Sequence, residues 1–236
     1  MVKEFLFKDR PSLFAALASD CQSHLAKALA DRGATTFMVS GGSTPAPLYE
    51  ALSLSDLDWE NINVALVDER WVDKEHSASN EALIYRSLLI NNAANASFIG
   101  MKTGAKSAAE GCAETEALYQ ALPKPFAISI LGMGNDGHTA SLFPHADGLG
   151  EALAEGNQRL TAAIMAKQSE VTGPNTERLT LTLNGLLQSE RLIILLTGEE
   201  KLAVFRQAMA EGPTEDMPIR AVLRQDKVPV ELYWAP

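Results

Sequence analysis

The stretch FAISILGMGNDGHTASLFP, residues Phe126–Pro144, decides the fold of this chain. Its first six residues are apolar apart from one serine, a pattern typical of a strand that is buried on both faces of a sheet. Three glycines, an amide, an acid and a histidine follow at once, so the strand ends in a loop with unusual backbone freedom. The stretch therefore predicts a buried strand that carries His138 into a functional loop.

On either side of this stretch, short apolar runs alternate with segments of helical periodicity. The expected strands are Val2–Phe7, Thr35–Val39, Asn63–Val67, Ser97–Ile99, Phe126–Leu131, Leu160–Met165, Arg178–Leu183, Arg191–Leu196 and Val230–Trp234. The expected helices are a long one that begins at Asp9-Arg10-Pro11 and ends near Arg32, and Ala46–Leu54, Ser79–Leu89, Ser107–Leu122, Asn184–Ser189 and Glu199–Ala210. This alternation predicts an α/β fold: a single Rossmann-like domain, residues 1–236, with a mostly parallel sheet and helices on both faces.

The composition is typical of one domain without an export or membrane signal. At 236 residues and 46% hydrophobic content, the chain can bury a sizeable core, and no linker, low-complexity tract or repeat divides it. The charged N-terminal segment MVKEFLFKDR lacks the apolar region of a signal peptide, and aliphatic runs such as Leu192–Leu196 are too short to span a bilayer. Cys21 and Cys112 form no disulfide framework. We therefore expect a cytoplasmic protein, monomeric or homodimeric.

The net charge of −10 limits the kind of partner. A nucleic acid would require a basic face, so the charge argues against one. A small anionic ligand stays compatible, because a few cations in one group of loops can reverse the local field. The expected partner is therefore a small molecule, with neither a nucleic acid nor a membrane.

Loops after four strands are expected to meet at one edge of the sheet, because parallel α/β sheets bind ligands beyond the carboxyl ends of their strands. The first, Gly41-Gly42-Ser43-Thr44, lies between a strand and a helix start, where backbone N–H groups and hydroxyls can bind an anion. A tight turn with an ordinary helix cap explains the same residues equally well. The loop is not a Walker A motif, since no GK[ST] follows at the required spacing.

Charged residues follow other strands. Asp68 and Arg70 come directly after an apolar strand, where they would either flank an oxygen-rich ligand or form a salt-bridged loop. Arg178 precedes an alternating strand. Lys201 lies in the first turn of a helix, where the helix dipole disfavours a cation by roughly a few tenths of a kcal/mol. A bound anion would compensate this cost, although a solvated surface lysine is the simpler explanation.

His138 is the strongest candidate for chemistry, because a histidine accepts a proton at neutral pH and Asp136 lies two residues away. Most loop histidines are merely solvated, but Gly132, Gly134 and Gly137 indicate a backbone geometry that ordinary loops do not need. These glycines also match the dinucleotide fingerprint G-x-G-x-x-G. The match lies in mid-chain and a proline soon interrupts the segment, so a nicotinamide site is disfavoured. The sequence contains no G-x-S-x-G elbow and no typical zinc-ligand spacing.

Six segments resemble one protein family, in the same order along the chain. They are SGGSTPAPLYEAL (Ser40–Leu52), VDERWV (Val67–Val72), SNEALIYRSLL (Ser79–Leu89), LGMGNDGHTASLFPH (Leu131–His145), RLTLTLNGLL (Arg178–Leu187) and GEEKLAVFRQAM (Gly198–Met209). Together they resemble the bacterial 6-phosphogluconolactonases, which are relatives of the glucosamine-6-phosphate deaminases. The likeness spans nearly the whole chain, and its most specific part is the GNDGHTASLFP segment.

The resemblance implies a Rossmann-like domain that hydrolyses 6-phospho-D-glucono-1,5-lactone to 6-phosphogluconate without a metal or nucleotide cofactor. It implies that His138 is the base that activates water, and that Asp68 and Arg70 line the sugar and its reacting carbonyl. Asp136, Asp68 or a backbone carbonyl would orient the imidazole. The residues expected to bind the phosphate and the rest of the substrate are Gly41, Gly42, Ser43, Thr44, Gly134, Asn135, Arg178 and Lys201.

Two other functions stay open on the same fold. In the deaminases the histidine loop continues to an acid that works with the histidine in opening the sugar ring. This chain has Phe143 at that position, which favours lactone hydrolysis. A non-catalytic sugar-phosphate sensor would keep the phosphate-binding residues but could lose His138, whereas this chain keeps both sets.

Overall fold

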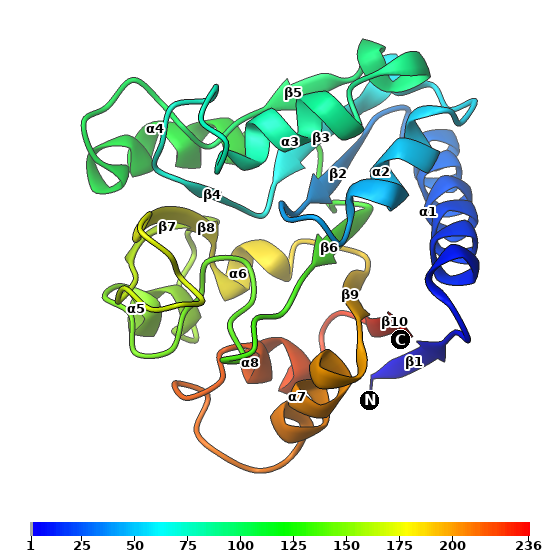
Figure 1. The fold of residues 1–236 in the computed structure, drawn as a ribbon. Coiled ribbons are helices and arrows are strands. Elements are labelled where there is room, and N and C mark those ends of the chain that lie inside the picture. The colour runs from blue at the N-terminus through cyan, green and yellow to red at the C-terminus, as the bar shows by residue number, and fades with distance from the viewer. Residues whose placement is uncertain (1) are drawn as a thin grey trace.

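The computed structural model describes residues 2–236 and has a seven-stranded sheet at its centre (Figure 1). In spatial order, its strands are β1 (Lys3–Leu6), β10 (Val230–Ala235), β9 (Leu192–Thr197), β6 (Ile128–Leu131), β2 (Thr35–Val39), β3 (Ile62–Leu66) and β5 (Ser97–Ile99). All neighbouring strands in this sheet are parallel. The predicted α/β fold with a mostly parallel sheet is thereby confirmed.

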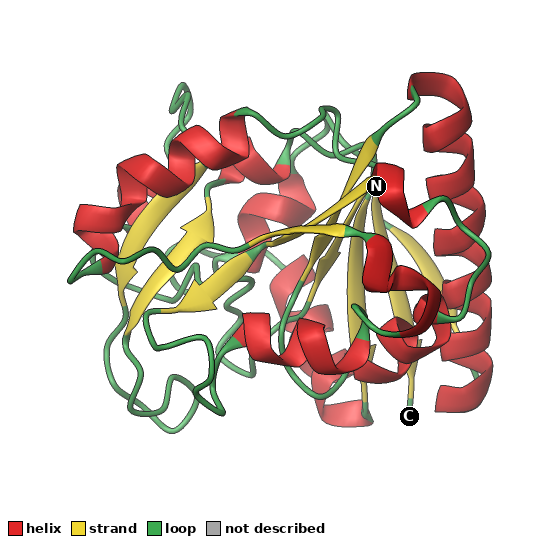
Figure 2. Cartoon of the chain, turned by 90° about the horizontal axis from the view of Figure 1, so that it is seen from above, coloured by secondary structure: helices red, strands yellow, loops and turns green. Residues whose placement is uncertain are grey.

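Helices lie on both sides of the central sheet (Figure 2). The helices are α1 (Arg10–Arg32), α2 (Ala46–Ser53), α3 (Asn80–Ser87), α4 (Ala108–Gln120), α5 (Leu149–Leu153), α6 (Leu183–Leu186), α7 (Glu199–Met209) and α8 (Ile219–Arg224), with 3₁₀ turns η1 (Trp59–Asn61) and η2 (Asn91–Asn95). Helix α1 begins where the Asp9 carboxylate accepts the N–H of Ser12 at 2.8 Å. It ends at Gly33, whose φ of 76° only glycine adopts readily. Within residues 2–236, no helix is both long and apolar enough to cross a membrane.

Three further strands form a separate antiparallel sheet, in the order β4 (Asp68–Arg70), β8 (Glu177–Leu181) and β7 (Thr161–Met165). We expected Asp68–Arg70 to be a polar loop, because three charged residues carry no strand signal of their own. Their strand conformation comes from pairing with β8, which places Arg70 opposite Arg178. Figure 2 shows this small sheet beside the central one. It brings two cations to the edge of the cavity described below.

Candidate active site

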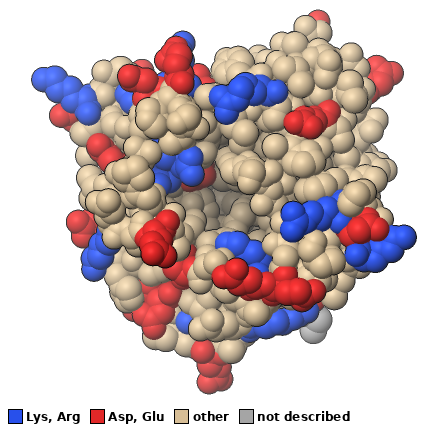
Figure 3. All heavy atoms as spheres, in the orientation of Figure 1, with Lys and Arg blue, Asp and Glu red and all other residues tan. Residues whose placement is uncertain are grey.

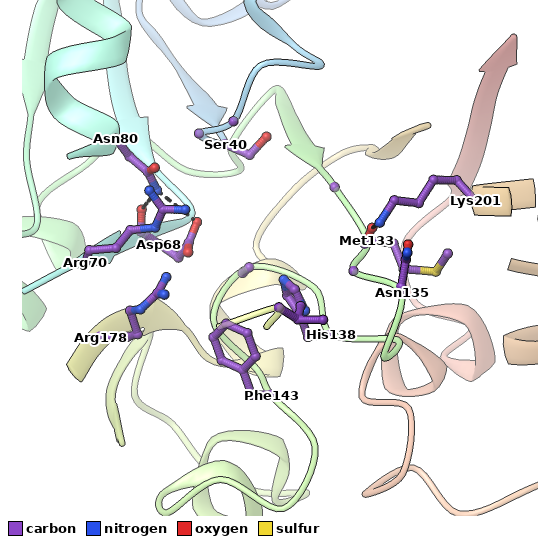
Figure 4. Close-up of a pocket in the computed structure, with 16 residues that line it drawn as sticks. Ser40, Asp68, Arg70, Asn80, Met133, Asn135, His138, Phe143, Arg178 and Lys201 are labelled. Atoms are coloured by element: carbon purple, nitrogen blue, oxygen red, sulfur yellow. Dashed lines mark hydrogen bonds between the residues drawn. The ribbon is translucent and has the colours of Figure 1, made fainter. Parts of the chain in front are cut away.

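A cavity of about 360 Å³ opens at the carboxyl edge of the central sheet, where the loops after β2, β3, β6 and β9 converge as predicted (Figure 4). Figure 3 shows this hollow at the centre of one face, with lysine and arginine atoms beside it. The residues that line it are Ser40, Gly41, Gly42, Asp68, Arg70, Asn80, Gly132, Met133, Gly134, Asn135, His138, Ala140, Phe143, Val171, Arg178 and Lys201.

His138 lines the cavity and is held by Asp136. Its Nδ1 atom lies 2.6 Å from Oδ1 of Asp136, which also accepts the backbone N–H of His138 at 3.1 Å. Burial alone would raise the pKa of Asp136, but the hydrogen bonds from His138 outweigh it and hold that pKa below its usual value. Because an ionised carboxylate only accepts, the Nδ1 atom carries the proton and the neutral ring has an unprotonated Nε2. Asp136 is thus the orienting group, rather than Asp68 or a backbone carbonyl.

The histidine loop depends on two glycines. A Cβ atom on Gly134 would lie 2.1 Å from Nδ1 of His138 and 2.5 Å from Oδ1 of Asp136, so the contact between these groups requires glycine there. Gly137 has a φ of +79°, and its N–H donates to the carbonyl of Gly134 at 3.0 Å. No helix begins between residues 132 and 148. The loop therefore lacks the helix that a dinucleotide fingerprint requires.

Asp68 joins three elements at the wall of the cavity. Its Oδ2 accepts the hydroxyl of Ser141 at 2.6 Å, and its Oδ1 accepts an N–H of the Asn80 amide at 3.3 Å. Ser141 belongs to the histidine loop and Asn80 to the first turn of α3. Asp68 is 7% exposed, so the position of its carboxylate is fixed by these contacts before any ligand arrives.

Glu69, the middle residue of the charged triplet, has a structural role instead. It is 1% exposed and does not line the cavity. Its carboxylate accepts the backbone N–H groups of Asn80 and Glu81, each at 2.8 Å, at the start of α3. Burial raises the pKa of Glu69 against the effect of these hydrogen bonds. Glu69 therefore fixes the helix that carries Asn80.

Three cationic side chains line the cavity, namely Arg70, Arg178 and Lys201. Within residues 2–236, none of them forms an ion pair. Burial lowers the pKa of Arg178 to about 10 despite the attraction of Asp68, and burial also lowers the pKa of Lys201. The Nζ atom of Lys201 donates to the carbonyl of Met133 at 2.8 Å. In a chain of net charge −10, this cluster favours an anionic ligand.

The glycine loop after β2 reaches the cavity only in part. Gly41 and Gly42 line it, and an adjoining pocket of about 150 Å³ between this loop and Lys201 also includes Thr44. Ser43 is exposed to solvent and lines neither space, so the structure does not bring it to the site. The loop offers backbone N–H groups and one hydroxyl beside a lysine, which suits a phosphate group.

The predicted residues that share the cavity are Gly41, Gly42, Asp68, Arg70, Gly134, Asn135, His138, Arg178 and Lys201. Asn135 also donates to the carboxylate of Glu200 at 2.6 Å, which ties the histidine loop to α7. Sequence reasoning missed Asn80, because the hydroxyl of Ser79 accepts the N–H of Ala82 at 3.1 Å and the segment looks like an ordinary helix start. The sequence offered only an asparagine directly after a serine at a helix start as a signal.

Known proteins resemble this chain along nearly its whole length. The model of the family described as glucosamine-6-phosphate isomerases/6-phosphogluconolactonase matches residues 8–234. A 6-phosphogluconolactonase of Rhizobium meliloti is 39% identical over 231 residues, covering 98% of this chain and 97% of that protein. One of Mesorhizobium japonicum is 39% identical over 230 residues, covering 98% and 94%. The crystal structure of a 6-phosphogluconolactonase from Shewanella baltica has a TM-score of 0.94 at 39% identity, covering 100% of this chain and 98% of that one.

Proposed function

The chain belongs to the glucosamine-6-phosphate isomerase/6-phosphogluconolactonase family, and we propose that it hydrolyses 6-phospho-D-glucono-1,5-lactone to 6-phosphogluconate, the second step of the oxidative pentose phosphate pathway. One observation carries the proposal: the Asp136–His138 pair adjoins a cavity with three cations that form no ion pair with any residue from 2 to 236. A lactone ester requires an activated water, and its phosphate requires cations. The relatives named 6-phosphogluconolactonase support the same reaction.

In the first step, Nε2 of His138 removes a proton from water as the water oxygen attacks the lactone carbonyl carbon. The Nδ1–H group of His138 donates to Asp136, so the imidazole keeps the tautomer whose Nε2 can accept a proton. The carboxylate of Asp136 also stabilises the imidazolium that forms. The base and a positioned water account for roughly 10²–10⁴-fold of rate. Because the lactone also opens spontaneously, a modest reduction of the barrier suffices.

We assign to Arg70 the stabilisation of the negative charge that develops on the carbonyl oxygen. Its Nη1 donates to the carbonyl of Ala78 at 2.5 Å, while its buried Nε has no hydrogen-bond partner in the described chain. Because Arg70 lines the cavity, the part of its guanidinium that faces the cavity can donate to the oxyanion as it forms. The tetrahedral intermediate then collapses, the bond from the carbonyl carbon to the ring oxygen breaks, and the imidazolium of His138 returns its proton to that oxygen.

The phosphate is assigned to the side of the cavity away from Arg70, with Lys201 and the loop that contains Gly41, Gly42 and Thr44; Arg178, which lies beside Arg70, is the further cation that attracts it. Further substrate contacts are assigned to the polar groups nearby: the carboxylate of Asp68 accepts from sugar hydroxyls, and the residues Gly134 and Asn135 lie beside the base. The Ser43 hydroxyl is the weakest member of the set, because its side chain is exposed to solvent.

The aldose–ketose isomerase alternative needs a second acid beside the histidine to open the sugar ring. The position proposed for that acid holds Phe143, whose ring packs against the imidazole. We place the lactonase in the cytoplasm as a monomer or homodimer, with a sugar phosphate rather than a nucleic acid or membrane as its partner, in keeping with the net charge of −10. Neither a metal nor a nucleotide is required for any step above.

The test is hydrolysis of freshly generated 6-phosphogluconolactone, followed by acid release and corrected for the spontaneous rate. We expect wild-type protein to accelerate acid release strongly and His138→Ala to lose most of that acceleration. A parallel reaction with glucosamine 6-phosphate, followed by ammonia release, addresses the isomerase alternative. Ammonia release without lactonase activity would refute the proposal.

A further inference from the structure

The ring of Phe143 lies between the proposed base and a proposed anion-binding arginine (Figure 4). Its centroid is 4.3 Å from that of the His138 imidazole, and the ring planes make an angle of 33°. The guanidinium carbon of Arg178 lies 5.3 Å from the same centroid. The ring lines the cavity yet is only 4% exposed, so packing fixes it against both groups.

The imidazole of His138 needs this support. Within the described residues, its ring has one hydrogen bond, from Nδ1 to Asp136. A single hydrogen bond fixes the position of Nδ1 but lets the rest of the ring tilt about it. The backbone at Gly134 leaves room for the ring, while Phe143 presents a flat apolar surface that limits the tilt. The direction of Nε2 therefore depends on Asp136 and Phe143 together.

Arg178 is attached to a different part of the fold. Its Nε donates to the carbonyl of Asn175 at 2.7 Å and its Nη2 to that of Thr172 at 3.0 Å, both in the loop between β7 and β8. Phe143 belongs to the histidine loop, and its ring meets the guanidinium in a cation–π contact. That contact links the guanidinium to the loop that carries His138.

We propose that Phe143 is a positioning residue that fixes the spacing between the base and the anion-binding arginine, and so places the lactone carbonyl at Nε2 of His138. The inference rests on the proposed lactonase function. An error of about 1 Å in such a spacing costs up to about 10²-fold in rate. Phe143→Leu is therefore expected to lower kcat roughly ten- to hundredfold and to raise KM for the lactone as well.

Two double-mutant cycles separate positioning from general packing. Phe143→Leu is combined with Asp136→Asn and scored by kcat, and combined with Arg178→Lys and scored by KM. We expect each double variant to lose less than the product of the two single losses, because the second change acts on a group that the first has already released. Phe126→Leu is the matched control: its ring is fully buried and does not line the cavity, so it should cost stability and leave kcat unchanged.

Phe143→Met, which replaces the ring with a flexible, unbranched side chain of nearly the volume of leucine, is tested in the same cycles as a second variant, and the melting temperature of every variant is recorded. Multiplicative losses in both cycles, or an unchanged kcat in either folded Phe143 variant, would overturn the inference. If wild-type protein has no lactonase activity, the proposed function fails and this inference fails with it. If the wild type is active and both cycles are multiplicative, only the inference fails.

Discussion

Replacing Gly134 by alanine should disable the base without removing it. The new Cβ atom would lie 2.1 Å from Nδ1 and 2.2 Å from Cε1 of His138, and 2.5 Å from Oδ1 of Asp136. Since non-bonded carbon contacts are most favourable at about 3.5–4.0 Å, the ring and the carboxylate must both retreat by roughly 1 Å or more. Their hydrogen bond is 2.6 Å long, so the retreat breaks or redirects it and turns Nε2 away from the attacking water.

Displacement of a reacting group by about 1 Å costs roughly 10²-fold in rate, which corresponds to about 2.7 kcal/mol of activation free energy. We expect kcat of Gly134→Ala to fall by about this factor. Affinity for the product 6-phosphogluconate should stay near that of the wild type, because Arg178 and Lys201 are untouched. The rate is followed by acid release from freshly generated lactone, and the affinity by calorimetry.

Gly104→Ala is the control, because its Cβ would meet no atom within 4 Å and Gly104 does not line the cavity. It should retain the wild-type kcat. A wild-type kcat in folded Gly134→Ala would refute the reasoning, since turnover would then not depend on the contact between Asp136 and His138. Equal losses in the two variants would refute it as well, because the loss would then not depend on the contacts that a Cβ makes at Gly134.

Three further predictions concern the same groups. His138→Ala should lose most lactonase activity with product affinity nearly intact, and near-normal turnover would contradict its role as base. Arg178→Ala or Lys201→Ala should chiefly raise KM, by about ten- to hundredfold for a lost charged hydrogen bond, and an unchanged KM would assign the phosphate to another place. Asp136→Asn should be less stable than wild type near neutral pH. Because the folded-state pKa of Asp136 is lowered, this difference is present above its unfolded value of about 3.9 and is lost as pH falls through the folded-state pKa; a constant difference in urea unfolding across pH would contradict it.

The central sheet was predictable because its signals are local. Runs such as Phe126–Leu131 and Arg191–Leu196 are apolar enough to require burial on both faces, and they contain most of β6 and β9. Strand β4 was not predictable, because Asp68–Arg70 has no apolar residue and its partner lies far along the chain. Alternation in Arg178–Leu183 did predict β8. The alternation could not reveal which strand pairs with β8, since the residues of one strand do not specify its partner.

Residue type was enough to identify the candidate site residues. Which groups they contact depends on the three-dimensional structure. In the sequence, Asp136 and Asp68 were equal candidates to orient His138. Gly134 decides between them, because the missing side chain lets the ring fold back onto Asp136 within one loop. The reason for that glycine is steric and appears only when the ring is in place.

Ser43 shows a different limit of sequence-based prediction. Its residue type and its place before a helix predict an anion contact, yet its side chain is exposed to solvent. The preceding Gly42 has a φ of +94°, a conformation that glycine adopts as readily as an ordinary one. The sequence therefore leaves the direction of the turn open, and with it the side on which the hydroxyl emerges.

The two proposed tasks of the site, activation of water and binding of an anion, depend on residues from different sheets. The central sheet supplies the histidine loop, while the small sheet places Arg70 opposite Arg178. Like charges opposite each other destabilise a strand pair, and repulsion from Arg70 adds to burial in lowering the pKa of Arg178. The attraction of Asp68 outweighs this repulsion, so burial is the effect that leaves the pKa of Arg178 lowered. A cation held away from water in this way suits the proposed recognition of an anionic substrate. Phe143 lies where the two sheets' contributions meet, in contact with one residue from each.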